Sequence, residues 1–105
     1  MTPLQIDQFV INRMSRATMG DDEALNQAVL TLRPLVLAAI PQEALTLAPV
    51  TVCTQEAIIA LHEALVLWQP ASGHFVECLD RRLRSRLVSL FLRLRDLDQQ
   101  VEVAV

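Results

Sequence analysis

Six arginines gather in the last quarter of this 105-residue chain, and four of them form a tight cluster: Arg81, Arg82, Arg84 and Arg86. Clustered guanidinium groups can neutralise phosphates, so a nucleic-acid-binding regulator is one alternative function that the sequence raises. Acidic residues lie close by in the sequence at Glu77, Asp80, Asp96 and Asp98. We expect the arginines to pair with these acids, or with the acidic first part of this or another chain, and we do not expect nucleic acid as the partner.

Two histidines and two cysteines raise a second alternative, a metal- or thiol-dependent enzyme. His74 and Cys78 stand four residues apart on one face of a predicted helix, and Cys53 and His62 would complete a set of four zinc ligands. The pair His74–Cys78 would also suit a base beside a thiol nucleophile. The short ligand pairs of structural zinc sites are absent, and both cysteines have apolar neighbours. We therefore expect no metal, no cofactor and no catalytic residue.

The charge is distributed unevenly along the chain. The net charge is −3, but residues 1–80 carry nine acids and three arginines, whereas residues 81–105 carry six arginines and three acids. All nine basic residues are arginine. This bias is typical of a GC-rich bacterial or phage genome, and we expect such a source.

Hydrophobic residues make up 52% of the chain, and the mean hydropathy is +0.35. A chain of this length has little interior, so part of its apolar surface should lie at an interface. The longest apolar run, residues 35–40, is too short to span a bilayer, and the first residues lack the pattern of a signal peptide. We expect a cytoplasmic protein with no membrane span, two free thiols and a homodimeric state.

Capping residues and apolar spacing predict the first two helices. Thr2 and Pro3 are typical of a helix start, and Gly20 of a helix end. Acidic residues 21–23 mark the start of the second helix. Because proline lacks an N–H and clashes with the preceding turn, Pro34 predicts that this helix ends or kinks near Arg33.

The middle of the chain is harder to interpret. A new helix can start at Pro41, but residues 45–53 alternate around Pro49, which fits either an irregular connection or a short strand. Thr54 is predicted to cap the next helix, which runs to Trp68. A turn at residues 70–73 precedes a long helix over residues 74–99, and residues 101–105 are either its frayed end or a strand.

The long C-terminal helix has more apolar residues than one buried stripe can use. Its main seam is Val76, Leu83, Leu87, Leu90, Leu94, Leu97 and Val101, which are spaced three and four residues apart from Leu83 onward. Val88, Phe91 and Leu92 point away from that seam, so residues 87–94 are apolar on most of the helix circumference. Such a segment is either enclosed or shared between two interfaces. The partner interface that we predict consists of Trp68, Leu87, Val88, Phe91, Leu92 and Arg95.

Together these patterns predict one all-α domain over residues 1–105, a small bundle of four to five helices with a long, central C-terminal helix and an irregular proline-containing segment in the middle. The function that we expect is non-enzymatic. The chain would bind another protein, or a second copy of itself, through the apolar surface of its last helix, as an adaptor, an inhibitor or a chaperone-like subunit.

Overall fold

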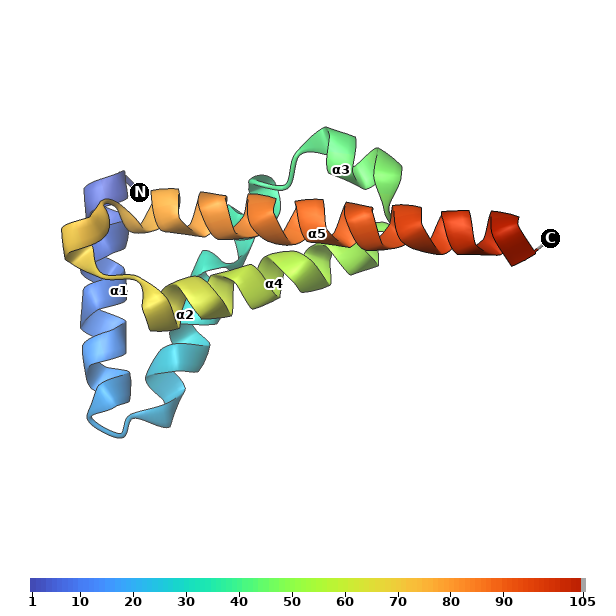
Figure 1. Ribbon diagram of the computed structural model, residues 1–105. Helices are drawn as coiled ribbons and strands as arrows, with labels where there is room; N and C mark the ends of the chain where they lie inside the picture. Colours follow the sequence, from blue (N-terminus) through green and yellow to red (C-terminus); the bar gives the residue numbers. More distant parts are fainter. Residues whose placement is uncertain (105) are drawn as a thin grey trace.

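The computed structural model describes the backbone of residues 1–104 and the side chains of residues 1–99. The fold is the predicted all-α bundle, with a long C-terminal helix and no strand among the described residues. The helices, in chain order, are α1 (Pro3–Thr18), α2 (Asp22–Ala38), α3 (Gln42–Leu47), α4 (Val50–Leu67) and α5 (Phe75–Ala104), with a short 3-10 helix, η1 (Pro70–Ser72), before α5. α1 and α2 form a hairpin at one end of the molecule (Figure 1).

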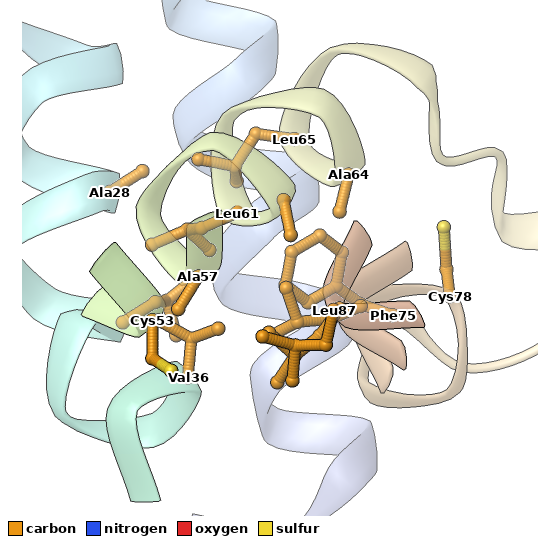
Figure 2. Packing of buried hydrophobic residues seen from close by; sticks show 14 of the residues in the cluster. Ala28, Val36, Cys53, Ala57, Leu61, Ala64, Leu65, Phe75, Cys78 and Leu87 are labelled. Atoms are coloured by element: carbon orange, nitrogen blue, oxygen red, sulfur yellow. The ribbon is translucent and has the colours of Figure 1, made fainter. Parts of the chain in front are cut away.

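The centre of the bundle is α4, and not α5 as the sequence suggested. α4 packs against α1, α2, α3 and α5. Three alanines on one side of it, Ala57, Ala60 and Ala64, are fully buried and let the neighbouring helices approach closely. Leu61 and Phe75 fill the space between the helices, and both are fully buried (Figure 2). Small and large side chains therefore alternate in one continuous core.

The helix starts follow from local capping. The Thr2 hydroxyl accepts a hydrogen bond from the Gln5 N–H at 3.2 Å, and the Gln5 side chain accepts one from the Thr2 N–H at 2.8 Å. This reciprocal pair is a capping box, with Pro3 in the first turn. At the start of α2, the Asp21 carboxylate accepts from the Glu23 N–H at 3.2 Å. Both starts are those predicted from the sequence.

Pro34 does not end α2, so that prediction was wrong. The helix continues through Pro34 to Ala38. Leu32 and Val36, on either side of the proline, are 1% and 0% exposed. Burying these two side chains on one helical face offsets the hydrogen bond that proline cannot make, while Pro34 itself is exposed.

The predicted irregular segment 45–53 is also mostly helical. Only Ala48 and Pro49 separate α3 from α4, and α4 begins at Val50, four residues before the Thr54 cap that we expected. Pro49 precedes the first turn, where the missing N–H costs nothing. Burial of Cys53 and Ala57, four residues apart, then favours the helix over the strand.

The strand interpretation of residues 101–105 is wrong for the part that is described, because α5 stays helical to Ala104. Position 105 lies outside the described residues. α5 extends beyond the ends of α3 and α4, so its last turns project from the bundle (Figure 1). This projection makes the molecule elongated, at 55 × 27 × 23 Å.

By length and composition alone, α4 is apolar enough to cross a membrane. The core helix of a bundle meets the same criterion, and α4 occupies the core in this fold. It also carries Glu56 and Glu63, whose carboxylates are ion-paired with arginines of α5. We interpret α4 as a core helix, and it gives little support to a membrane span.

Candidate protein-binding groove

An apolar groove runs along α5 on the side where α3 lies. Its inner part is a hollow of about 280 Å³ lined by Pro41, Glu43, Ala44, Leu47, Arg84, Leu87, Val88 and Phe91. Its outer part is a hollow of about 190 Å³ lined by Leu47, Phe91, Leu94, Arg95 and Asp98. Leu47 and Phe91 line both hollows, so the two form one surface. We call it the α3–α5 groove.

The floor and walls of the groove leave apolar side chains in contact with solvent. Leu87 is 3% exposed and forms the floor, whereas Phe91 is half-buried. Val88 and Leu47 are 56% and 63% exposed. Burying an apolar side chain of this kind is worth roughly 25 cal/mol per Å². A partner that covered the groove would gain most of its binding energy from Leu47, Val88 and Phe91.

Charged residues of both signs line the groove beside its apolar surface. Glu43 comes from α3, and Arg84, Arg95 and Asp98 come from α5. The Arg84 side chain is 71% exposed and forms an ion pair with Asp80 at 3.0 Å, an exposed pair that contributes little to stability. An apolar floor with charges of both signs beside it matches an amphipathic helix.

The second wall of the groove is α3, of which the sequence indicated the start at Pro41 but not the continuation to Leu47. α3 has six residues, and Ala44 and the following Ala48 are buried against the bundle. The Cys53 thiol of α4 lies 3.6 Å from the Ala44 carbonyl oxygen, as its hydrogen-bond donor. This anchoring turns Leu47 outward onto the groove. A helix of one and a half turns is too short for its periodicity to show in the sequence.

The structure brings four of the six predicted interface residues together. Leu87, Val88, Phe91 and Arg95 all line the groove. Leu92, on the neighbouring side of α5, is 45% exposed and lines neither hollow.

Trp68 lies apart from these residues, at the turn between α4 and α5. Its indole N–H donates to the Gly73 carbonyl oxygen at 3.0 Å, and its ring packs edge-on against Phe75 with 5.6 Å between centroids. Trp68 also lines a separate hollow with α1, together with Val10 and Met14. Its contacts within the chain are those of a residue that holds the turn.

Most of the arginine cluster is engaged in ion pairs. Arg86 donates to Glu56 at 2.7 Å and also to Glu63, and Arg82 donates to Glu63 at 3.2 Å. These pairs join α4 to α5, so the arginines do meet the acidic part of their own chain, as expected. The Arg84–Asp80 pair is also among those expected.

A polar cleft of about 340 Å³ lies beside these ion pairs, between α4 and α5. It is lined by Glu56, Glu63, Arg82, Ser85, Arg86, Ser89 and Arg93. Two carboxylates offset two of its three guanidinium groups. The cleft is therefore a weak site for phosphate, which requires cations that are not already neutralised. Among the clustered arginines, Arg81 is exposed and is not among the ion pairs found.

Asp7 of α1 is the one buried charged residue among the described side chains, and it caps the N-terminus of α5 although it belongs to another helix. Its carboxylate accepts from the Phe75 N–H at 2.8 Å and from His74 Nδ1 at 2.6 Å. A carboxylate at a helix N-terminus satisfies a free N–H and complements the helix dipole. The hydrogen bond to Asp7, together with the charges of Asp7 and Glu77, raises the pKa of His74.

The residues considered for metal or thiol chemistry do not converge. No group of three His, Cys, Asp or Glu side chains suited to a metal ion occurs in the described part of the chain. Cys53 and Cys78 are both free and buried. Burial raises the pKa of the Cys53 thiol, which disfavours the nucleophilic thiolate. His74 is held by Asp7, and His62 is exposed on α4.

Comparisons of this chain with protein-family models, with curated proteins and with solved structures found no significant match to any of the three.

Proposed function

We propose that this chain is a non-enzymatic protein-interaction module that receives an amphipathic helix of a partner protein in the α3–α5 groove. The observation that carries the proposal is the groove itself, a continuous apolar surface with charged residues beside it, formed by two helices and open in the isolated chain. An adaptor, an inhibitor or a chaperone-like subunit would each act through such a surface.

The size of the apolar surplus supports this proposal. Val88, Leu92 and Leu97 of α5, with Leu45 and Leu47 of α3, are all between 40% and 63% exposed. Single exposed apolar residues are ordinary, but Leu47 and Val88 line one hollow together with Phe91, and a continuous apolar surface of this kind is typical of an interface. The ion pairs of Arg82 and Arg86 also favour a protein partner over nucleic acid, since these guanidinium groups already have carboxylate partners.

The test compares two matched substitutions. Val88→Asp puts a charge in the middle of the groove, whereas Leu30→Asp puts the same charge at a position of α2 that is 68% exposed and lies outside the groove. Proteins captured by the wild-type chain from its host are identified, purified and titrated calorimetrically against wild type and both variants.

We expect Val88→Asp to weaken binding of the identified partner at least tenfold, about 1.4 kcal/mol, while Leu30→Asp leaves it unchanged. Circular dichroism should show both variants folded. Equal binding to all three proteins, or binding lost equally in both variants, would overturn the proposal. Binding to DNA or RNA that weakens with salt and requires Arg81 and Arg84 would favour the nucleic-acid alternative instead.

A further inference from the structure

We infer that the α3–α5 groove accepts a second copy of this chain, with the two α5 helices antiparallel and a two-fold axis passing close to Phe91. This inference rests on the proposed function, and it identifies the helix that the groove receives.

The charges along α5 are ordered in a way that favours an antiparallel pair. Residues 81–95 contain six arginines and no acid, whereas residues 96–102 contain three acids and no arginine. A parallel pair of α5 helices would bring arginines against arginines. An antiparallel pair brings the acidic end of each helix against the arginine-rich stretch of the other, which is the complementary arrangement.

Two of the charged residues of the groove, Arg84 and Asp98, are placed evenly about Phe91. Arg84 lies seven residues before Phe91 and Asp98 seven residues after it, and all three line the groove. Seven residues are close to two helical turns, so the three side chains share one face, with the charged ones roughly 10 Å from Phe91 along the axis. A two-fold axis at Phe91 therefore places Arg84 of each copy opposite Asp98 of the other.

The same symmetry matches the apolar residues. Val88 lies three residues before Phe91 and Leu94 three residues after it. In the antiparallel pair, Val88 of each copy faces Leu94 of the other, and the two Phe91 rings meet at the axis. The contact is isologous, so it closes at two copies and does not propagate into a filament.

The projecting end of α5 makes this arrangement accessible. The last turns of α5 extend past α3 and α4 (Figure 1), so the end of this helix can lie beside a second helix without displacing its own bundle. Asp98 lines the outer hollow of the groove, and Asp96, Leu97 and Asp98 are all exposed. Arg84 offers an exposed guanidinium whose present partner is Asp80, one turn earlier on the same helix.

Charge reversal at the two paired positions tests the inference by sedimentation velocity. Arg84→Glu alone places a carboxylate against Asp98 at both symmetric contacts, and Asp98→Arg alone places a guanidinium against Arg84 at both. Each variant alone should raise the dimer dissociation constant by roughly 30-fold, because the two symmetric charge pairs change from attraction to repulsion. In an equimolar mixture, a dimer with one copy of each variant has opposite charges at both contacts. The mixture should therefore associate better than either variant alone.

In this mixed dimer, one contact joins the two substituted side chains and the other joins the two native side chains. Each contact therefore pairs a carboxylate with a guanidinium. The mixture should therefore approach the dissociation constant of the wild-type chain.

Arg81→Glu provides the control, because Arg81 belongs to the same exposed cluster but does not line the groove. It should change the dissociation constant far less than Arg84→Glu. Thermal melts of each variant at low concentration check that the monomers remain folded.

A wild-type chain that stays monomeric into the high micromolar range would overturn the inference, as would a mixture that associates no better than either variant alone. Association unaffected by either single reversal would exclude this antiparallel register. The proposed function would survive any of these results if Val88→Asp still abolished binding of an identified partner while Leu30→Asp did not.

Discussion

Asp7→Ala should destabilise the whole bundle, although Asp7 lies 67 residues away in the sequence from the histidine it contacts. The substitution removes the acceptor of the Phe75 N–H and leaves that donor buried without a partner. Loss of a helix N-cap costs about 0.5–2 kcal/mol, and an unpaired buried donor costs about 1–3 kcal/mol. Both figures describe largely the same hydrogen bond, so we expect a total of about 2 kcal/mol.

Urea unfolding followed by circular dichroism measures this loss directly, because a stability change moves the midpoint without changing the slope. The melting temperature should fall by about 8–12 °C for a domain of this size. Since self-association would add to apparent stability, the curves are recorded at two protein concentrations. Asp7→Asn is the matched control, because its amide oxygen can still accept from the Phe75 N–H. We expect Asp7→Asn to cost about 1 kcal/mol, mainly from the lost charge beside His74 and the helix terminus.

Two results would refute this reasoning. A loss below about 0.5 kcal/mol for Asp7→Ala would mean that the N-terminus of α5 does not depend on this cap. Equal losses for Asp7→Ala and Asp7→Asn would mean that the hydrogen bond to the Phe75 N–H is not the important part of the contact.

Three further predictions concern the same turn and the ion pairs between α4 and α5. Because the pKa of His74 is raised in the folded state, its contribution to stability is complete below its unfolded value of about 6.5 and is lost as pH rises through the higher folded value. His74→Gln should therefore remove that decline from urea midpoints measured across pH. Gly73→Ala should cost about 1–3 kcal/mol, because Gly73 has φ +118° and a Cβ there would lie 2.9 Å from a Glu77 carboxylate oxygen. Arg86→Met should cost about 1–2 kcal/mol in low salt and less in high salt, because it leaves the Glu56 carboxylate, only 12% exposed, with a single longer contact.

A different result would contradict each of these three predictions. A pH dependence that persists in His74→Gln would assign the decline to another group. If Glu77→Ala fully rescued Gly73→Ala, the cost would come from the side-chain clash and not from the backbone conformation. An Arg86→Met cost that did not change with salt would mean that lost packing of the arginine stem, and not charge, dominates.

The helices could be predicted wherever capping residues and apolar spacing agree. Thr2, Pro3 and Gly20 define α1, and a turn ending at Gly73 precedes α5. Pro34 and Pro49 each led to a wrong prediction, for different physical reasons. Pro34 is tolerated because tertiary burial on both sides of it outweighs the local penalty, and Pro49 is harmless because it lies just before a helix. Burial of the neighbouring side chains decides whether a helix continues past a proline, and local sequence patterns do not reveal that burial.

The α5 side of the groove was predictable, and the α3 side was not. The apolar excess around α5 is visible in the sequence and indicates Val88 and Phe91. Leu47 gives no such signal, since α3 is too short to show a period. The contacts that join distant segments, Asp7 with His74 and Glu56 with Arg86, are separated by 67 and 30 residues, and no spacing rule connects them.

The central claim, that the α3–α5 groove is a protein-binding surface, is tested most directly by hydroxyl-radical footprinting of the chain alone and in complex. The complex is either the chain at a concentration where it self-associates or the chain with an identified partner. The account predicts that Leu47, Val88 and Phe91 lose reactivity in the complex, while Met19 and Leu30, exposed elsewhere, react as before. Groove residues that stay as reactive in the complex as in the free chain would contradict it.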